Sequence, residues 1–533
     1  MAFVPTKIPY HQTGFYSKTV VDYLDSENAL QSFFTHPVND KGLEEAINAR
    51  LAFDTNRHAT AEALIEQYKS VAACDVVQSN IEALRNATTF TITTAHQPNI
   101  FTGPLFFLYK IIHAIKLAEH CKQLFPQYNF VPVYYMGSED ADLDELGHVY
   151  INGHKKNWGT TQTGAVGRMV VDKNLLKLID NIAGEIGVQP HGDEIIATIK
   201  KFYTEGTTIQ QATFKLVNEL FGKYGVLVII PDNAALKNIA HTIFEDELLH
   251  SHSSAITEAT GNKLTKAGYN AQAYSRDINF FYLLDDKRER IEKDGEQWKV
   301  VNTGISFTKD ELMYELKEHP ERFSPNVILR GIFQETILPN IAFIGGGGEL
   351  AYWLQLKSLF EHYKVPYPML VLRNSFLIID EKSNQLKTRL GFSNEDLFTP
   401  AQRLQNKWVE KNSTNNLSVD QSLQSINDLY NKLSAQAKAI DSTLLQHIDA
   451  LKTNTLKRVE IVGKKMLRAE KRNHADAMNQ TKKLKQKLFP NNNLQERIDN
   501  FIPYYARYGS AFIDELYKNS LSLEQEFVVL EEK

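Results

Sequence analysis

Five short apolar segments constrain the fold of this chain more than any other feature. Four are rich in β-branched or aromatic residues and predict buried strands: residues 89–95 (TFTITTA), 130–136 (FVPVYYM), 225–230 (GVLVII) and 369–372 (MLVL). Residues 340–344 (NIAFI) predict a fifth strand. Amphipathic patterns at 105–122 and 349–363 predict helices after two of these strands. This alternation predicts an α/β protein built on a parallel sheet with crossover helices.

Two long insertions separate the predicted strands. The 533 residues exceed what one compact core holds, so we expect two or three structural units. Residues 153–208 are polar and predict helices, and residues 236–325 contain the charged stretch LLDDKRERIEKDGEQWKV, which is typical of a hairpin. We interpret both insertions as subdomains or lids added to the core.

From about residue 419 the pattern becomes that of a coiled coil. Apolar residues recur at alternating three- and four-residue steps, namely Leu423, Ile426, Tyr430, Leu433, Ala437, Ile440, Leu444, His447 and Leu451. Helical patterning continues to Pro490 and predicts either one helix about 100 Å long or a bent pair. A heptad pattern of this kind favours a homodimer. The second half is basic, and we interpret it as a solvated face, or alternatively as a face that leans over the active site.

Composition excludes several classes of protein. The net charge is -5 and the pI is about 6.4, so we expect no nucleic-acid partner. The two cysteines cannot form a disulfide framework or a thiolate metal cage. No apolar stretch approaches the roughly 20 residues of a membrane span, and the N-terminus lacks the pattern of a signal peptide. We therefore expect a cytoplasmic protein with no membrane partner.

The loop after the first predicted strand is dense in polar residues. It offers His96, Gln97, Asn99 and Thr102, followed by Gly103 and a proline that suits the first turn of a helix. Free backbone N–H groups at such a helix start bind anions. We predict that this loop binds an anionic group, and His96 is also a candidate acid or base.

Acidic residues follow the second predicted strand. Glu139 and Asp140 stand directly at the strand end, where they are candidates to receive a substrate amine or to act as a base. Asp142 extends them to a D-x-D pattern, which is also found in metal-dependent transferases of sugar nucleotides. The acids beyond Asp142 suit the start of a helix and need no further role.

A glycine run and two arginines complete the candidate site. Gly345, Gly346 and Gly348 lie in a run of four glycines after the strand at 340–344, and Glu349 and Tyr352 follow them. Glycines before a helix allow a ligand to approach the backbone closely, although the run matches neither a Walker motif nor a dinucleotide fingerprint. We place Arg330 and the Arg373–Asn374 pair at the ends of further strands, where arginines suit carboxylate or phosphate groups.

Four separated segments resemble one known family, that of BshC, the cysteine-adding enzyme of bacillithiol biosynthesis. They are TAHQPNIFTGPLFFLYKIIHAIKLA, VPVYYMGSEDADLDELGHV, SPNVILRGIFQETILPNIAFIGGGGELAYWLQLK and LQERIDNFIPYYARYG, in matching order and spacing. The chain departs from the family pattern in three respects. Ala141 stands where a histidine is frequent, which removes one candidate acid or base; Gly331 and Gly347 replace prolines; and His96 replaces a glutamine.

The resemblance implies a Rossmann-like core with two inserted connecting subdomains and a C-terminal α-helical coiled coil that pairs subunits. Applied to this chain, it divides the sequence into core residues 1–152, 209–235 and 326–410, inserted subdomains 153–208 and 236–325, a coiled coil at 415–490 and C-terminal helices at 491–533.

The resemblance also implies a reaction, the joining of L-cysteine to the amine of glucosaminyl-malate. Amide formation from a free carboxylate is uphill in water, so we expect activation by ATP with Mg²⁺, while no protein-bound metal is predicted. In this hypothesis Glu139, Asp140 and His96 are catalytic. The other candidate residues bind substrate. The alternatives are a metal-dependent transferase of sugar nucleotides or nucleotidyl groups, which would use Asp140 and Asp142, and a coiled-coil scaffold without catalysis.

Overall fold

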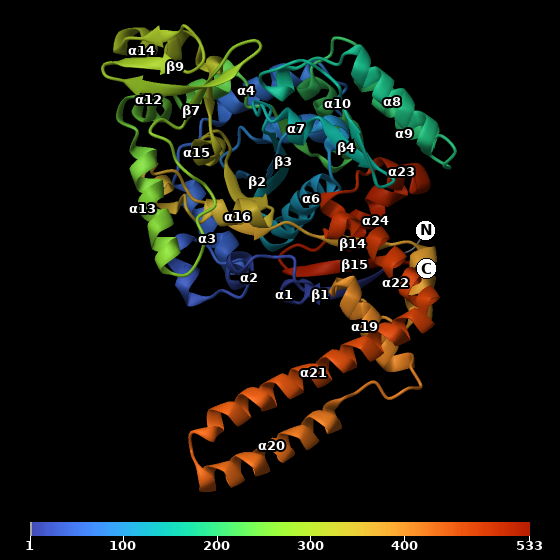
Figure 1. Ribbon diagram of the computed structural model, residues 1–533. Coiled ribbons are helices and arrows are strands. Elements are labelled where there is room, and N and C mark those ends of the chain that lie inside the picture. Colours follow the sequence, from blue (N-terminus) through green and yellow to red (C-terminus); the bar gives the residue numbers. More distant parts are fainter. Residues whose placement is uncertain (1–2) are drawn as a thin grey trace.

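A five-stranded parallel sheet forms the centre of the protein. The structure, a computed structural model, describes residues 3–533. All five predicted strands belong to this sheet, in the order β13 (Met369–Leu372), β12 (Asn340–Gly345), β2 (Thr89–His96), β3 (Asn129–Met136) and β6 (Leu227–Ile229). His96 pairs with Met136, and Gly345 pairs with Leu372. The strands therefore end together at one edge, and the predicted α/β class is confirmed (Figure 1).

Helices cover the sheet and complete its core. Helix α6 packs on β2 and β3, and it is apolar on nearly all sides because it lies between the sheet and the C-terminal segment. Helix α3 packs on β12 and β13. The helices around the sheet are α2 (Lys18–Leu24), α3 (Asp40–Leu51), α4 (Arg57–Tyr68), α5 (Asp75–Ala83), α6 (Phe106–Leu124), α10 (Ile209–Phe221) and α15 (Val327–Ile337).

The first insertion is small and helical. A two-stranded hairpin, β4 (His148–Ile151) and β5 (His154–Asn157), leads into helices α8 (Lys173–Ile186) and α9 (Gly192–Phe202). Both helices are amphipathic and bury their isoleucines and leucines, such as Ile179 and Ile199.

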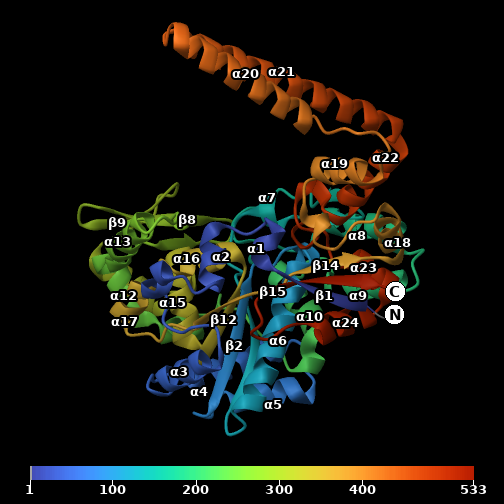
Figure 2. The same cartoon turned by 90° about the horizontal axis from the view of Figure 1, so that it is seen from below.

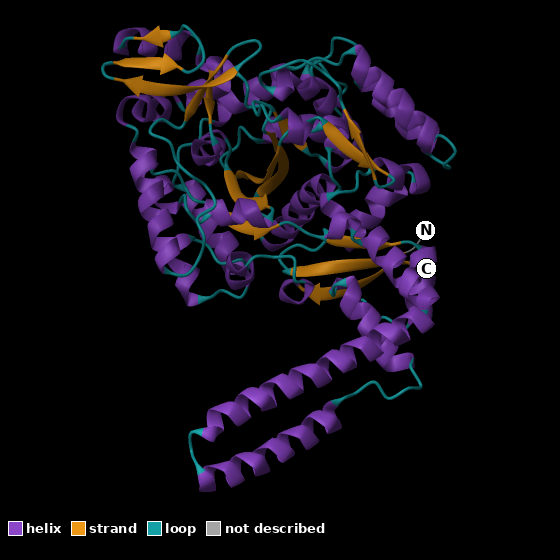
Figure 3. Cartoon of the chain, in the orientation of Figure 1, coloured by secondary structure: helices purple, strands orange, loops and turns teal. Residues whose placement is uncertain are grey.

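The second insertion combines helices with an antiparallel sheet. The helices are α11 (Ala234–Ile239), α12 (His241–His250), α13 (His252–Lys266) and α14 (Lys309–Glu318). The sheet has the order β10 (Ser306–Phe307), β9 (Gln297–Val300), β8 (Arg288–Asp294), β7 (Phe280–Leu283) and β11 (Phe323–Pro325). The predicted charged hairpin is thus confirmed as β8 and β9 (Figure 3).

A third sheet joins the two ends of the described chain. Strand β15 (Glu526–Glu532) lies between β1 (Phe3–Pro9), which is antiparallel to it, and β14 (Phe376–Ile379), which is parallel. Helices α23 (Ile502–Tyr508) and α24 (Ala511–Asn519) return the chain to the core. The expectation of helices alone after residue 491 was therefore incomplete, because the segment 526–532 pairs with two strands and buries Val528 to Leu530.

The coiled-coil region is a helical hairpin that projects from the rest of the protein (Figure 2). Helix α20 (Asp420–Ile440) packs along α21 (Leu444–Asn473), and Tyr430 Oη lies 2.9 Å from Thr455 Oγ1 across the pair. Helices α18 (Glu381–Leu390), α19 (Ala401–Asn412) and α22 (Ala475–Leu488) form its base. Of the two predicted forms, the bent pair is therefore confirmed. No described helix has the combination of length and apolarity that crossing a bilayer requires.

Two local predictions were wrong. The predicted helix at 349–363 is divided into α16 (Gly347–Trp353) and α17 (Lys357–Tyr363), and the buried side chain of Gln355 between them bonds the backbone of Gln272 and Ala273. Arg330 does not follow a strand. The apolar run before it belongs to α15, where the Asn326 side chain caps the helix by accepting from the backbone N–H of Ile328.

Candidate active site

A cavity of about 650 Å³ opens at the edge where the parallel strands end. This is the position at which α/β sheets bind their ligands. Its walls come from the loops after β2 and β3, from α15 and α16, and from the second insertion. Eight of the predicted site residues line it: His96, Gln97, Glu139, Asp140, Arg330, Gly348, Glu349 and Tyr352.

His96 lies at the end of β2 with its ring between two aromatic side chains. The ring centroids of Phe106 and Phe107 lie 5.1 and 5.5 Å away. Burial lowers the pKa of His96 well below its usual value, and the charges of Lys110, Arg373 and Arg330 lower it further. The ring is therefore neutral at neutral pH. Its buried Nε2 has no hydrogen-bond partner within the described chain, so it is free to bond a ligand.

Asp140 is one of two carboxylates in the lining that no lysine or arginine of the described chain neutralises, and the other is the exposed Glu145. The Gln97 side chain donates to Asp140 Oδ2 over 3.1 Å, and the backbone N–H of Asp142 donates to Oδ1 over 3.3 Å. No lysine or arginine within residues 3–533 forms an ion pair with Asp140. Each carboxylate oxygen accepts up to two bonds, so one acceptor site per oxygen remains for a substrate ammonium group.

Glu139 is committed to a buried ion pair. Its Oε1 contacts the ammonium group of Lys237, whose side chain is fully buried, and Ser324 Oγ donates to its Oε2 over 3.0 Å. Lys237 also donates to the carbonyl of Glu321 over 3.0 Å. The pair joins the β3 loop to α11 and to the second insertion. This arrangement favours a positioning role for Glu139, although its prediction as a catalytic residue stays a prediction.

A second ion pair holds the opposite wall. Glu349 Oε2 pairs with the buried Lys110 and also accepts from the backbone N–H of Gly346 over 2.8 Å, which caps the start of α16. Lys110 donates to the carbonyl of Ala95 over 2.8 Å. The pair thus ties α16 to α6 and β2, and it leaves Gly348 facing open space.

Arg330 carries a positive charge into the cavity from α15. Burial alone would lower its pKa, but Tyr352, Tyr135 and Asp140 surround it and raise the pKa above its usual value. One of its terminal nitrogens lies 3.4 Å from Tyr352 Oη. The guanidinium group is therefore charged, and it lines the cavity without forming an ion pair with a carboxylate of residues 3–533.

Three predicted residues of the first loop do not line the cavity, namely Asn99, Thr102 and Gly103. Phe101, Thr102 and Gly103 all have positive φ values, of 51°, 68° and 67°. The buried Asn500 side chain holds this turn by donating to the carbonyls of Phe101 and Gly103. A Cβ atom at Gly103 would lie 2.8 Å from Asn99 Cβ. The structure therefore gives Asn99, Thr102 and Gly103 a conformational role, which the prediction of an anion site did not include.

Five other predicted residues also lie outside the lining of the cavity. The carboxylate of Asp142 caps α7 (Leu143–Leu146) through the backbone N–H of Glu145. Arg373 is buried against Glu496, with 2.7 Å between the charged groups, and Asn374 bonds Ser520 and Leu521. Gly345 and Gly346 pack against neighbouring side chains of the core. Of the predicted pair Asp140 and Asp142, only Asp140 therefore lines the cavity.

Sequence reasoning missed most of the positive charge in the cavity. Arg276, Arg288 and Arg290 reach it from the second insertion, and Lys110 and Lys237 lie in helices. Arg288 stacks on Phe281 at 3.9 Å and donates to Ser324 over 3.1 Å. The cluster of three basic residues at 287–290 (KRER), within the charged stretch LLDDKRERIEKDGEQWKV, was the signal that could have found Arg288 and Arg290.

The charges in the cavity favour an anionic ligand with an amine. Two of the four lining carboxylates, Glu139 and Glu349, are neutralised by lysines. Four arginines line the same space, namely Arg276, Arg288, Arg290 and Arg330. Within residues 3–533, three of these arginines form no ion pair, and Arg290 pairs over 3.3 Å with Glu292, which does not line the cavity. A ligand with several negative groups and an ammonium group therefore matches the arginines and the two unpaired carboxylates, Asp140 and Glu145.

A larger cavity, of about 870 Å³, lies at the base of the helical hairpin. Lys483, Lys487, Asp499 and Arg507 are among its lining residues, and none of the predicted site residues lines it. The smaller cavity is therefore the candidate active site.

Comparison with known families matches the whole described chain. Residues 4–374 match the N-terminal Rossmann-like domain of bacillithiol biosynthesis BshC, and residues 376–532 match the C-terminal coiled-coil domain of the same family. The boundary between the two falls at the start of β14, just after the last strand of the parallel sheet.

Relatives named "Putative cysteine ligase BshC" match along nearly their full length. The relative from Christiangramia forsetii is 37% identical and covers 99% of both chains. The relative from Flavobacterium johnsoniae is 37% identical and covers 98% of this chain and 99% of its own. The relative from Cytophaga hutchinsonii is 36% identical and covers 97% of both.

Proposed function

Since the chain belongs to the BshC family of bacillithiol biosynthesis, we propose that it is a ligase that joins L-cysteine to the amine of glucosaminyl-malate. The observation that carries the proposal is the lining of the cavity of about 650 Å³. Asp140 and four arginines line it, and within residues 3–533 none of these arginines forms an ion pair with a lining carboxylate. Glucosaminyl-malate has two carboxylates and one amine, which is the complement of that lining. We propose the cytoplasm as its compartment.

Arginines of the second insertion and of α15 hold the malate part in this proposal. A guanidinium group binds a carboxylate through two parallel hydrogen bonds, and burial strengthens such a pair. Arg288 and Arg330 are largely buried in the lining of the cavity, and they bind the malate carboxylates. Arg276 also lines the cavity but is exposed, and it attracts anionic substrates.

Asp140 receives the amine. An ammonium group must lose a proton before its nitrogen can attack a carbonyl carbon, and Asp140 is placed to accept that proton. The Gln97 side chain donates to Asp140 Oδ2, and the backbone N–H of Asp142 donates to Oδ1. Together these two bonds fix the orientation of the Asp140 carboxylate. The neutral His96 bonds the substrate through its unpaired Nε2.

The carboxylate of cysteine requires activation before the amide can form. An oxygen must leave its carbon, and transfer of a phosphoryl or adenylyl group from ATP with Mg²⁺ supplies such a leaving group. Residues that fit phosphate groups are the arginines of the cavity and the open backbone at Gly348. ATP as the activating co-substrate is part of this proposal.

Purified protein supplied with L-cysteine and glucosaminyl-malate, with and without ATP and Mg²⁺, tests the reaction by mass spectrometry. We expect bacillithiol only when ATP is present. Arg330→Met should raise the KM for glucosaminyl-malate at least about 10-fold, because the lost charge–carboxylate bond is worth about 1.5–3 kcal/mol. Arg389→Met is the matched control, since Arg389 is exposed on α18 and bonds only Gln480. No product in any mixture would overturn the proposal.

We also propose that two copies of the chain pair through the helical hairpin. Large apolar side chains on α20 and α21 remain exposed even though the two helices pack together, namely Leu429, Leu433, Ile440, Leu444, Leu451, Ile461 and Val462. An exposed apolar stripe on a two-helix hairpin supports burial against a second copy.

A further inference from the structure

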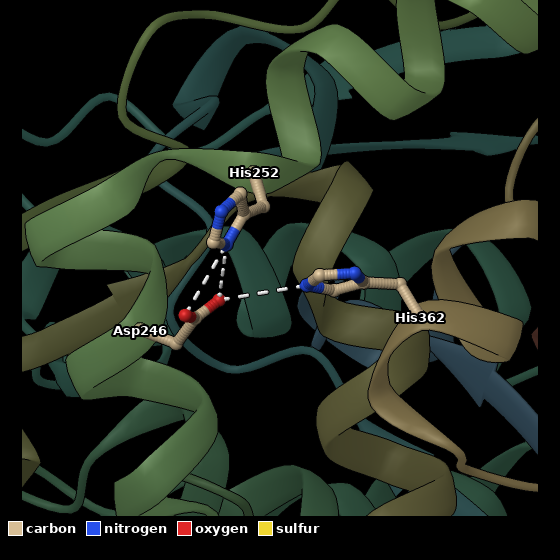
Figure 4. A group of neighbouring side chains, drawn as sticks. All are labelled: Asp246, His252 and His362. Atoms are coloured by element: carbon tan, nitrogen blue, oxygen red, sulfur yellow. Dashed lines mark hydrogen bonds and ion pairs between the residues drawn. The ribbon is translucent and has the colours of Figure 1, made fainter.

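We propose that Asp246, His252 and His362 form a binding site for Zn²⁺ on the face of the protein where the second insertion meets the core. The three side chains converge on one point (Figure 4), and their ligand atoms all lie within 4.8 Å of one another. The group lies outside the cavity of the candidate active site, and the proposal does not depend on the proposed reaction.

Three different helices supply the three ligands. Asp246 lies in α12, His252 is the first residue of α13, and His362 lies in α17 of the core. Ser251, between α12 and α13, has a φ of 54°, in the left-handed region that non-glycine residues rarely adopt. This turn directs the chain back, so that His252 lies beside Asp246, which is six positions earlier in the sequence.

The distances between ligand atoms suit a tetrahedral zinc ion. With bonds of about 2.0–2.1 Å to nitrogen and oxygen, neighbouring ligand atoms of such an ion lie about 3.3 Å apart. His252 Nδ1 lies 3.0 Å from Asp246 Oδ2, and His362 Nε2 lies 3.7 Å from the same oxygen. The third pair of ligand atoms, those of His252 and His362, lies within 4.8 Å, so each pair is within about 1.5 Å of the distance that the ion requires.

The surroundings of Asp246 support a metal rather than a simple ion pair. Tyr363 Oη donates to Asp246 Oδ2 over 3.0 Å and helps to orient the carboxylate, as outer hydrogen bonds do in metal sites. At 3.7 Å His362 is too distant for a hydrogen bond to Asp246, yet its ring lies 4.9 Å from that of His252. Two imidazoles and a carboxylate are a set that zinc binds with a water molecule in the fourth position.

The consequence of an occupied site would be a link between the insertion and the core. Helix α13 packs along α17, and the ion would join both to α12. The same insertion carries Arg288 and Arg290 into the cavity of the candidate active site. Zinc would therefore hold the subdomain that supplies these arginines in a fixed position relative to α17.

Titration of the full-length protein with ZnCl₂ by isothermal calorimetry, after removal of metals with EDTA and exchange into EDTA-free buffer, tests the site. We expect one site in the wild type and an affinity at least about 10-fold lower in His252→Ala, in His362→Ala and in Asp246→Ala. His241→Ala is the matched control, because His241 lies on the same helix as Asp246 but pairs with Glu245 outside the group. Its zinc affinity should equal that of the wild type.

Cobalt(II) gives a second readout that reports on geometry. The wild type with one equivalent of Co²⁺ should show the intense visible absorption of a tetrahedral ion, and His362→Ala should lack it. His252 and His362 are partly exposed, with side-chain exposures of 45% and 34%, so their variants should fold even if Asp246→Ala does not. The proposal is overturned if the wild type binds Zn²⁺ no more tightly than His252→Ala and His362→Ala, or if His241→Ala loses as much affinity as they do.

Discussion

The buried pair of Lys237 and Glu139 allows a prediction whose size follows from the structure. The Lys237 side chain is fully buried and that of Glu139 is 10% exposed. Removing one partner of such a pair leaves an uncompensated charge and costs about 3–5 kcal/mol. In Lys237→Met, Glu139 keeps its bond from Ser324, so we expect a loss near the lower limit, about 3 kcal/mol.

Glu139→Gln should cost less than Lys237→Met. The amide oxygen of glutamine still accepts from Lys237, which also keeps the carbonyl of Glu321 at 3.0 Å and Asp232 at 4.0 Å. The double variant, with both replacements, contains no unpaired charge and should regain most of the stability that Lys237→Met loses.

Urea unfolding of the wild type and of the three variants, followed by fluorescence, measures these free energies. Lys200→Met is the control. Lys200 and Asp180 also form an ion pair, at 2.7 Å, but their side chains are 49% and 66% exposed. Such a surface pair contributes at most about 1 kcal/mol. The reasoning is refuted if Lys237→Met costs no more than Lys200→Met, or if the double variant is no more stable than Lys237→Met.

Three further predictions concern the base, the dimer and pH. Asp140→Asn should lower kcat about 100-fold or more without loss of stability, because a positioned base contributes about 10²–10⁴-fold. Asp142→Asn should leave kcat and stability nearly unchanged in the same assays, since asparagine also caps a helix well. Leu433→Asp combined with Ile440→Asp should convert a dimer into a monomer in light scattering, and an unchanged mass would contradict pairing through the hairpin. Burial raises the pKa of Asp499 from 3.8 to about 6, so between these pH values the folded state keeps a proton that the unfolded state has lost. The free energy of unfolding therefore falls as the pH rises from about 4 to 6. Asp499→Asn should therefore be more stable than the wild type at pH 8, by about 3 kcal/mol, with the difference vanishing near pH 4; equal stability at both pH values would count against a buried, charged Asp499.

Local patterns were sufficient for the strands of the parallel sheet. A strand buried on both faces carries no charged residue and is rich in apolar or β-branched residues, so TFTITTA and MLVL predict their own conformation. The strand at 526–532 was missed because EFVVLEE is acidic at both ends and is a strand only by virtue of its pairing with β1 and β14. The helix at 349–363 was predicted whole because its apolar pattern continues across the break, where Gln355 bonds a segment about 80 residues away in sequence.

The same distinction applies to the candidate site. His96, Gln97, Glu139 and Asp140 directly follow strands of one parallel sheet, so their convergence at one edge could be predicted from order alone. The burial of Arg373 against Glu496 could not be predicted in this way, because the two residues lie 123 positions apart in the sequence. Neither could the pairing of Glu139 with Lys237.

The sequence by itself therefore determined the class of fold, the edge of the sheet that bears polar loops and the family of the protein, because these depend on short-range patterns. Only the tertiary structure decided which charges remain available to a ligand. Lys237 and Lys110 neutralise two carboxylates, while the second insertion brings three arginines to the loop after β3. Availability depends on which opposite charge lies within about 4 Å, and that distance is set by packing between segments far apart in sequence.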